Sequence, residues 1–122
     1  MKLLYLEPVY SDIWGAHFQN LLNAHKLPET VVDVAHLESP AQEETPYMLQ
    51  KPYYFKDLFE TISQAEEDGY DAAMVGCAAD PGVRDARYMA GIPVIGPLQA
   101  GLYTAGLLGR KVCVLCTAHD GK

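Results

Sequence analysis

Basic residues are scarce in this chain of 122 residues. Nine lysines and arginines stand against sixteen aspartates and glutamates, and the formal net charge is −7. The sequence also contains no run of basic residues. Nucleic-acid binding requires clustered positive charge to neutralise phosphates, so we expect no nucleic-acid partner. The phosphate-binding motifs GxGxxG and GxxxxGK[ST] are also absent, which leaves nucleotide binding without support.

Long apolar runs are lacking as well. No stretch is long enough to cross a bilayer, and Glu7 and Pro8 interrupt the first apolar run too early for a signal peptide. The three cysteines, an odd number, fit a reduced compartment better than a disulfide framework. We therefore expect a cytoplasmic protein without a membrane partner. Hydrophobic residues make up 49% of the chain, enough to form the core of one domain.

Apolar or β-branched runs alternate with helical patterns along the chain. We expect strands over residues 2–6, 30–37, 71–76, 92–95 and 112–116, and helices over residues 11–24, 53–68, 82–90 and 98–108. Three prolines and two adjacent glutamates predict a loop over residues 39–52. The alternation implies parallel pairing through right-handed crossovers. The predicted fold is a three-layer α/β/α sandwich with a mainly parallel sheet, as in a flavodoxin-like lobe.

The predicted fifth strand is followed by six residues and no helix, although a parallel strand needs both of its faces covered. We therefore expect residues 1–109 to form a first α/β lobe. Residues 110–122 would then be the first strand and following loop of a second lobe, so that the chain is a truncated one.

Cys77 is the main candidate for chemistry. It ends an apolar strand-like stretch and precedes Ala78-Ala79-Asp80-Pro81-Gly82, a turn leading into a helix. Open α/β sheets bind ligands at the carboxyl ends of their strands, and a helix N-terminus favours a thiolate. The small side chains of Ala78 and Ala79 would leave their backbone N–H groups open to a carboxylate or carbonyl oxygen. A buried structural cysteine is the alternative.

Cys113 and Cys116 form a CxxC pair within the predicted fifth strand. Residues three apart in a strand point to opposite faces, so the two thiols are poorly placed to share a metal ion. We expect Cys113 to pack in the core. Cys116 and Thr117, at the end of that strand, could line the same site as Cys77.

Other polar residues follow the predicted strands at the same edge of the sheet. Glu7, Tyr10 and Ser11 come after the first strand, where they would meet a substrate, and Ser11 or Asp12 could also cap a helix. His36 and His119 are weaker candidates, and a solvated or locally bonded role is favoured for every histidine. Tyr47, Tyr53, Tyr54, Phe55 and Phe59 could cover the site, although the spacing of the last two favours the core.

Several of these segments resemble the aspartate/glutamate/hydantoin racemase superfamily. Val75-Gly76-Cys77-Ala78-Ala79-Asp80-Pro81-Gly82-Val83 resembles the first catalytic-cysteine motif of the hydantoin-racemase branch. Residues 91–96 (GIPVIG) resemble its next strand, and residues 108–117 (LGRKVCVLCT) resemble the entry into its second half. Ser39-Pro40-Ala41 and Glu44 resemble the segment after its second strand. The resemblance is best over residues 69–117.

The resemblance implies two similar lobes with a cleft between them and one cysteine from each lobe. One thiolate removes the substrate α-proton and the other thiol delivers a proton to the opposite face. Cys77 would be the first of these, Ala78 and Ala79 would offer N–H groups, and Thr117 and Ser11 would hold a carboxylate or ring carbonyl. Neither a metal nor a pyridoxal cofactor is implied. The implied partners are a small-molecule carboxylate, amino acid or hydantoin, and a second copy of the chain in a homo-oligomer.

The chain departs from the family pattern in two ways. The family's Asn-Pro-Asn-Thr/Ser element appears as Glu7-Pro8-Val9-Tyr10-Ser11, so the amides that would bind polar groups of the substrate are replaced. The second catalytic cysteine lies in a half that these residues do not include, and neither Cys113 nor Cys116 matches it. We therefore expect the chain alone to be inactive or nearly so.

Two alternatives stay open. A maleate isomerase of the same superfamily also has a cysteine at the position of Cys77, where it acts as a nucleophile. An arylmalonate decarboxylase has glycine there, so Cys77 argues against that activity. A third possibility belongs to a different class: a non-catalytic lobe that binds a small acid or associates with another copy through exposed apolar surface.

Overall fold

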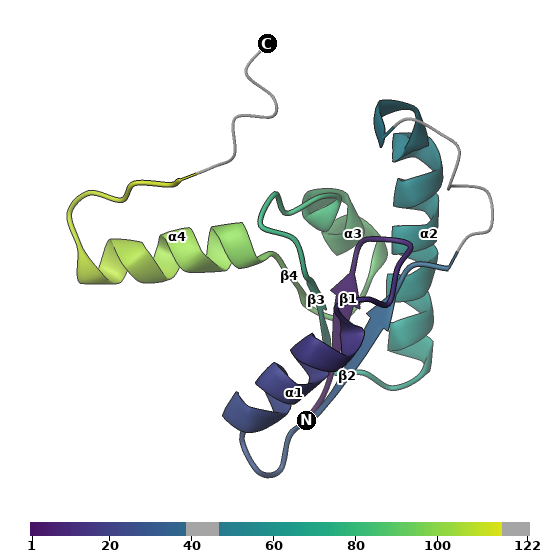
Figure 1. The fold of residues 1–122 in the computed structure, drawn as a ribbon, viewed down its shortest axis with the longest axis horizontal. Coiled ribbons are helices and arrows are strands. Elements are labelled where there is room, and N and C mark those ends of the chain that lie inside the picture. The colour runs from purple at the N-terminus through teal and green to yellow at the C-terminus, as the bar shows by residue number, and fades with distance from the viewer. Residues whose placement is uncertain (39–46, 116–122) are drawn as a thin grey trace.

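The computed structural model describes residues 1–38 and 47–115, and within them four parallel strands form one sheet (Figure 1). The strand order is β2-β1-β3-β4. The strands are β1 (Lys2–Glu7), β2 (Val31–His36), β3 (Ala72–Val75) and β4 (Val94–Ile95). The helices are α1 (Gly15–His25), α2 (Tyr47–Glu67), α3 (Val83–Met89) and α4 (Pro97–Leu108).

The register of the central strand β1 aligns the carboxyl ends of its neighbours. Leu6 is paired with Val75 of β3, and Glu7 is paired with His36 of β2. Because all pairs are parallel, the segments that leave the three strands emerge at the same edge of the sheet. This is the edge at which ligands bind in open α/β sheets.

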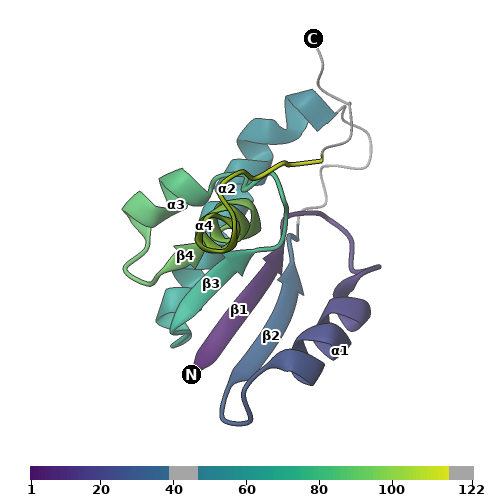
Figure 2. The ribbon, with the colours of Figure 1, turned by 90° about the vertical axis from the view of Figure 1, so that its left-hand side faces the viewer.

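Helices α2 and α3 cover one face of the sheet, and α1 covers part of the other (Figure 2). The core between the sheet and α2/α3 consists of fully buried aliphatic side chains, among them Leu6, Val75, Leu58, Ile62 and Val83. Alternation along the strands produces this face, because Leu4 and Leu6 point one way and Tyr5 the other. On the second face, the ring of Phe18 in α1 lies 5.2 Å from the ring of Tyr5.

Gln19 of α1 satisfies the outer edge of β2. Its side-chain Nε2 donates to the carbonyl oxygen of Val32 at 2.7 Å, and its Oε1 accepts from the N–H of Val34 at 3.1 Å. An edge strand otherwise presents unpaired backbone groups to solvent or to another chain. One side chain therefore both attaches α1 and closes part of this edge.

Helix α4 projects away from the sheet, as Figure 1 shows, and none of its residues is buried. It is apolar nonetheless: Tyr103 is 79%, Leu107 87% and Leu108 86% exposed. Side-chain hydrogen bonds join its first turn to the lobe that the structure describes. There Asp80 accepts hydrogen bonds from the N–H groups of Leu98 and Gln99, and Arg87 donates to the side chain of Gln99.

The predicted α/β fold with a mainly parallel sheet is confirmed. The helix predicted over residues 53–68 is also present, as the larger part of α2, and Gly69 follows it with a φ of +78°, which suits glycine. The loop expected over residues 39–52 is wrong in its second part. Helix α2 already begins at Tyr47 and contains Pro52. Pro52 is the sixth residue of this helix, so the helix continues through a position where proline removes one backbone hydrogen bond. Phe55 and Phe59 pack against the core as expected.

Two further expectations are wrong. Residues 112–115 are not a strand in the described part of the chain, and Cys113 is exposed rather than in the core. A strand needs a neighbour to pair with, and α4 leads these residues away from the sheet. Neither Ser11 nor Asp12 caps α1 through its side chain, because the helix begins at Gly15 with Trp14 as its N-cap.

Candidate functional site

Cys77 lies at the carboxyl end of β3, half-buried and with a free thiol. Two backbone hydrogen bonds shape its turn: the N–H of Cys77 donates to the carbonyl of Val75 at 2.8 Å, and the N–H of Asp80 donates to the carbonyl of Cys77 at 3.0 Å. Helix α3 begins only at Val83, after Gly82 at φ +68°. The thiol therefore follows the strand directly and is separated from α3 by a tight turn.

The backbone next to Cys77 offers unused donors. Ala78 and Ala79 are both exposed. Within the described ranges, neither of their N–H groups takes part in a hydrogen bond. Exposed N–H groups of a turn can donate to a carboxylate or to a carbonyl oxygen that gains negative charge. Their position beside a thiol is the arrangement that the sequence predicts for these two alanines.

Glu7 ends the neighbouring strand β1 with its carboxyl group buried. The residue is 3% exposed, and neither Oε1 nor Oε2 has a hydrogen-bond partner in the part of the chain that the structure describes. Burial raises the pKa of Glu7, and the nearby His36 partly offsets this. A buried carboxyl group without a donor costs free energy, so a purely structural role does not account for it.

Tyr5 joins the two strand ends and was missed by the sequence analysis. Its ring occupies the space where a side chain at position 76 would lie, since a Cβ on Gly76 would fall 2.5 Å from Tyr5 Cζ. Burial raises the pKa of Tyr5, and so do the negative charges of Glu7 and Cys77. The hydroxyl thus lies near both groups. Tyr5 and Glu7 are two residues apart on β1 and therefore point to the same face of the sheet, a signal that could have identified Tyr5.

His36 is the histidine that the structure brings to this edge of the sheet. It ends β2, is paired in register with Glu7, and acts on the pKa of that carboxyl group. His17 and His25 are exposed on α1, in keeping with the solvated or locally bonded role favoured for every histidine. Nδ1 of His25 lies 2.8 Å from the carbonyl oxygen of Leu21, a local contact within the helix.

Tyr10 and Ser11 follow β1, and each already has a hydrogen-bond partner within the lobe. The Tyr10 hydroxyl donates to Asp57 Oδ2 of α2 at 2.7 Å, which ties the loop after β1 to that helix. Ser11 Oγ accepts a hydrogen bond from the N–H of Ile13 at 3.4 Å. Their assignment as substrate-binding residues stays a prediction. The predicted contributions of Cys116, Thr117 and His119, and of the segment from Ser39 to Glu44, lie outside the described residues.

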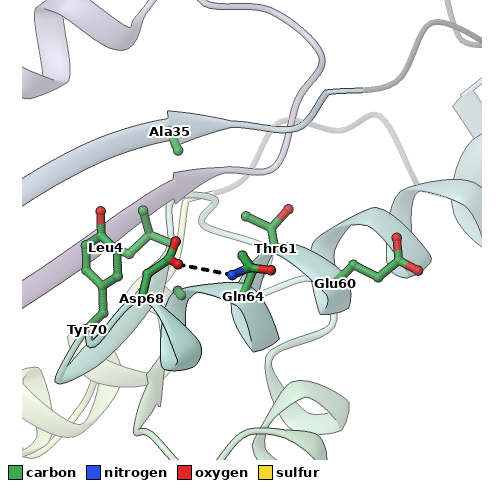
Figure 3. A pocket seen from close by; sticks show the side chains of 8 residues that line it. Leu4, Ala35, Glu60, Thr61, Gln64, Asp68 and Tyr70 are labelled. Atoms are coloured by element: carbon green, nitrogen blue, oxygen red, sulfur yellow. Dashed lines mark hydrogen bonds between the residues drawn. The ribbon is translucent and has the colours of Figure 1, made fainter.

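Surface grooves occur elsewhere on the lobe. One of about 400 Å³ lies between α2 and the outer strand β2 (Figure 3). Its lining includes Tyr70, Asp68 and Gln64, with a 3.0 Å hydrogen bond from Gln64 Nε2 to Asp68 Oδ1. A second, mostly apolar groove of about 340 Å³ lies beneath α1. Neither contains Cys77 or Glu7, so we place the candidate site by its chemistry at the strand ends.

Two negative findings apply to residues 1–38 and 47–115 alone. No three His, Cys, Asp or Glu side chains in these ranges are grouped closely enough to hold a metal ion. No helix there is both long and apolar enough to cross a membrane.

The site therefore combines a thiol, unused N–H donors and a buried carboxyl group at the ends of parallel strands. It lies on an α/β lobe, an architecture that serves many unrelated functions. Comparison with family models decides among such classes. The model of the Asp/Glu/hydantoin racemase family matches residues 15–122, and the chain belongs to this family. The predicted resemblance is thereby confirmed.

Individual relatives match in part. The chain is 34% identical over 58 residues to hydantoin racemase from Pseudomonas sp. (strain NS671), and 41% identical over 56 residues to hydantoin racemase from Rhizobium meliloti. These matches cover 48% and 46% of this chain, and 23% of each relative. The fold is similar to that of allantoin racemase from Klebsiella pneumoniae, with a TM-score of 0.74 and 21% identity over 88% of this chain and 43% of that one. The chain thus matches under half of the length of these relatives.

Proposed function

We propose that the chain is the first lobe of a cofactor-independent racemase acting on an amino acid or a hydantoin, and that Cys77 transfers the substrate α-proton. The observation that supports this most directly is the half-buried thiol at the end of β3, beside the unused N–H groups of Ala78 and Ala79. Membership of the racemase family supports this reaction class. The substrate and the role of each residue are part of the proposal.

The proposed step is a proton transfer at carbon. The Cys77 thiolate takes the α-proton and becomes a thiol, while the electron pair of the broken C–H bond moves into the adjacent carbonyl to form an enolate. The N–H groups of Ala78 and Ala79 donate hydrogen bonds to the oxygen that gains the charge. Return of a proton to the same face restores the starting enantiomer. Inversion requires an acid on the opposite face, since a racemase works from both sides of the carbon.

In the mechanism that the family resemblance implies, the acid on the opposite face is a second cysteine, and neither Cys113 nor Cys116 matches its position. The lobe alone is therefore expected to exchange the α-proton of one enantiomer at most, with little or no inversion. In a complete racemase, solvent deuterium enters the substrate while its optical rotation is lost. For the lobe alone we expect deuterium to enter with little loss of optical rotation.

The test incubates each enantiomer of a 5-alkyl hydantoin with the chain in D₂O, and follows deuterium at C5 by NMR and optical rotation by polarimetry. Deuterium should enter one enantiomer faster than in buffer, and Cys77→Ala should abolish the excess. Cys113→Ala, which changes an exposed cysteine, is the matched control and should behave as the wild type. Racemisation by this chain that survives Cys77→Ala would overturn the proposal.

A non-catalytic lobe is the second candidate, and the apolar surface of α4 favours it. Leu107 and Leu108 are almost fully exposed at the end of that helix. Such a lobe would bind a small acid or another protein chain without chemistry at Cys77. It predicts equal deuterium wash-in with and without Cys77. Maleate, assayed in parallel, tests the isomerase alternative, because its consumption would need Cys77 as a nucleophile.

A further inference from the structure

Asp80 connects the Cys77 turn to helix α4. Its carboxylate accepts two hydrogen bonds from the first turn of α4: Oδ1 from the N–H of Leu98 and Oδ2 from the N–H of Gln99, each at 2.8 Å. No side chain of α4 itself caps this helix. A side chain from the β3–α3 turn therefore satisfies N–H groups that the helix cannot pair internally.

The same residue is tied to Cys77 through its backbone. The N–H of Asp80 donates to the Cys77 carbonyl at 3.0 Å, and the Asp80 carbonyl accepts from Val83 at 3.3 Å. Asp80 is the described non-glycine residue with positive φ, at +47°. Aspartate tolerates this conformation better than most residues, but the turn still depends on contacts that hold it. The two hydrogen bonds to α4 are such contacts.

Close packing completes the connection. A Cβ on Gly96, immediately before α4, would overlap the Asp80 carboxylate, with Oδ1 and Oδ2 both 2.6 Å away. The backbone of Gly96 is extended, with φ −109° and ψ 129°, so glycine is required there by the close approach of Asp80 rather than by the backbone conformation. The start of α4 and the turn that holds Cys77 are thus in direct contact.

We propose that Asp80 is a positioning residue through which α4 controls the conformation of the Cys77 turn. Helix α4 has no buried residue, and the hydrogen bonds that join its first turn to the described lobe are those to Asp80 and the one between Arg87 and Gln99. Of these two partners, Asp80 is the one that lies in the Cys77 turn. Whatever packs on α4 would therefore act on Cys77 through the Asp80 carboxylate. The inference rests on the proposed function only in treating Cys77 as the catalytic thiol. The hydrogen bonds that link Asp80 to α4 and to the Cys77 carbonyl do not depend on the reaction.

The experiment measures the rate at which iodoacetamide alkylates Cys77 in the 122-residue chain, read by mass spectrometry of the tryptic peptide. Lys and Arg positions place Cys77 in one tryptic peptide and Cys113 together with Cys116 in another. Fragmentation of the second peptide separates its two cysteines, so the exposed Cys113 is an internal standard for reagent and pH. Asp80→Gly removes both acceptors while tolerating positive φ. We expect Cys77 to react about tenfold faster in this variant, because losing two charge-assisted hydrogen bonds populates open forms of the turn.

Gly96→Ala tests the connection from the side of α4. Its Cβ displaces the Asp80 carboxylate without any substitution within the Cys77 turn, and we expect a similar acceleration of Cys77 alkylation. The double variant Asp80→Gly with Gly96→Ala should react no faster than either single variant, because both remove the same contact. Gly101→Ala, in the same helix and with nothing within 4 Å of the added Cβ, should leave the rate at the wild-type value.

Asp80→Asn keeps the backbone preference and one acceptor oxygen, so its rate should fall between those of the wild type and Asp80→Gly. This intermediate rescue distinguishes the hydrogen-bonding role from a general loss of structure. A wild-type rate in Gly96→Ala, or multiplicative effects in the double variant, would overturn the proposal. These outcomes are separate from the failure of the proposed function, which the Cys77→Ala deuterium experiment detects whatever Asp80 does.

Discussion

The ring of Tyr5 occupies the space beside Gly76, one residue before the candidate catalytic thiol. An added Cβ at position 76 would lie 2.5 Å from Tyr5 Cζ, 2.6 Å from Cε1 and 2.7 Å from the hydroxyl oxygen. Gly76 follows β3 directly, and the Tyr5 ring of the adjacent strand β1 is packed against Phe18, so the ring has little freedom to move aside. The absence of a side chain at Gly76 therefore allows Tyr5 to lie over the end of β3, near both Glu7 and Cys77.

Gly76→Ala should destabilise the lobe by about 2 kcal/mol, because the methyl group must displace an aromatic ring held against Phe18. Urea unfolding monitored by circular dichroism measures the change. Tyr5→Leu in the same chain should recover much of this loss by removing the ring. Gly101→Ala is the matched control: its Cβ meets open space within a helix, so it should stabilise by about 0.5–1 kcal/mol. Equal losses at both glycines would contradict the packing argument.

The elements that the sequence predicted well are those with local signals. Continuous apolar runs identified β1 and β3, and Gly69 marked the end of α2 because a positive φ there suits glycine. The position of Cys77 followed from these boundaries, since a residue directly after a buried parallel strand lies at the ligand-binding edge. Glu7 was likewise expected at that edge from its place after β1.

The parts that sequence analysis missed depend on contacts distant in the chain. Asp80 caps α4 from another turn, and no spacing rule relates residue 80 to residue 98. The exposure of Cys113 was also unpredictable from its apolar neighbours, because a strand forms only when a partner strand is available. The unpaired state of the Glu7 carboxyl group depends on which donors surround it in three dimensions.

Glu7→Met should increase stability by about 1–3 kcal/mol at neutral pH, because it replaces a buried, unpartnered carboxyl group by an apolar side chain of similar length. Burial raises the pKa of Glu7 in the folded state above its ordinary value of 4.5. The folded state therefore holds the proton more tightly, and the wild type loses stability as the pH rises from about 4.5 through the raised pKa. The advantage of Glu7→Met should shrink toward pH 4.

Thermal or urea unfolding of both proteins between pH 4 and 8 checks this prediction. Glu67→Met, at an exposed position near the end of α2, is the control and should change stability by a few tenths of a kcal/mol at most, about the usual range for surface substitutions. A stability difference for Glu7→Met that did not vary with pH would show that the carboxyl group is partnered in solution.

Tyr70→Phe should destabilise the lobe by about 1 kcal/mol at neutral pH. The Tyr70 hydroxyl donates to Asp33 Oδ2 at 2.8 Å, and burial together with this hydrogen bond and the charge of Asp33 raises the pKa of Tyr70 to about 12. Its stabilising effect is thus present below pH 10 and is lost as the pH rises from 10 to 12. The gap between wild type and variant should close over that interval.

Unfolding by urea at pH 7, 10 and 11.5 measures the gap, and Tyr88→Phe provides the control because Tyr88 is 81% exposed. The position of Lys2 Nζ, 3.8 Å from the centre of the Tyr70 ring, is preserved by phenylalanine, so the comparison isolates the hydroxyl group. A gap that persisted unchanged at pH 11.5 would contradict the assignment of the hydrogen bond to Asp33.

Leu107 and Leu108 of α4 should mediate association between copies of the chain. Both are more than four-fifths exposed at the end of a helix without buried residues, and water-exposed leucines gain free energy when they are covered. Sedimentation velocity over increasing protein concentration should show a dimer or larger species.

Changing both leucines to lysine should weaken the association by about 100-fold, because at least about 1.5 kcal/mol of association free energy is lost for each leucine. Ile13→Lys, at an apolar side chain 72% exposed just before α1, should leave it unchanged. A wild-type chain that stays monomeric at every concentration would remove α4 as an association surface and with it the main support for the non-catalytic candidate.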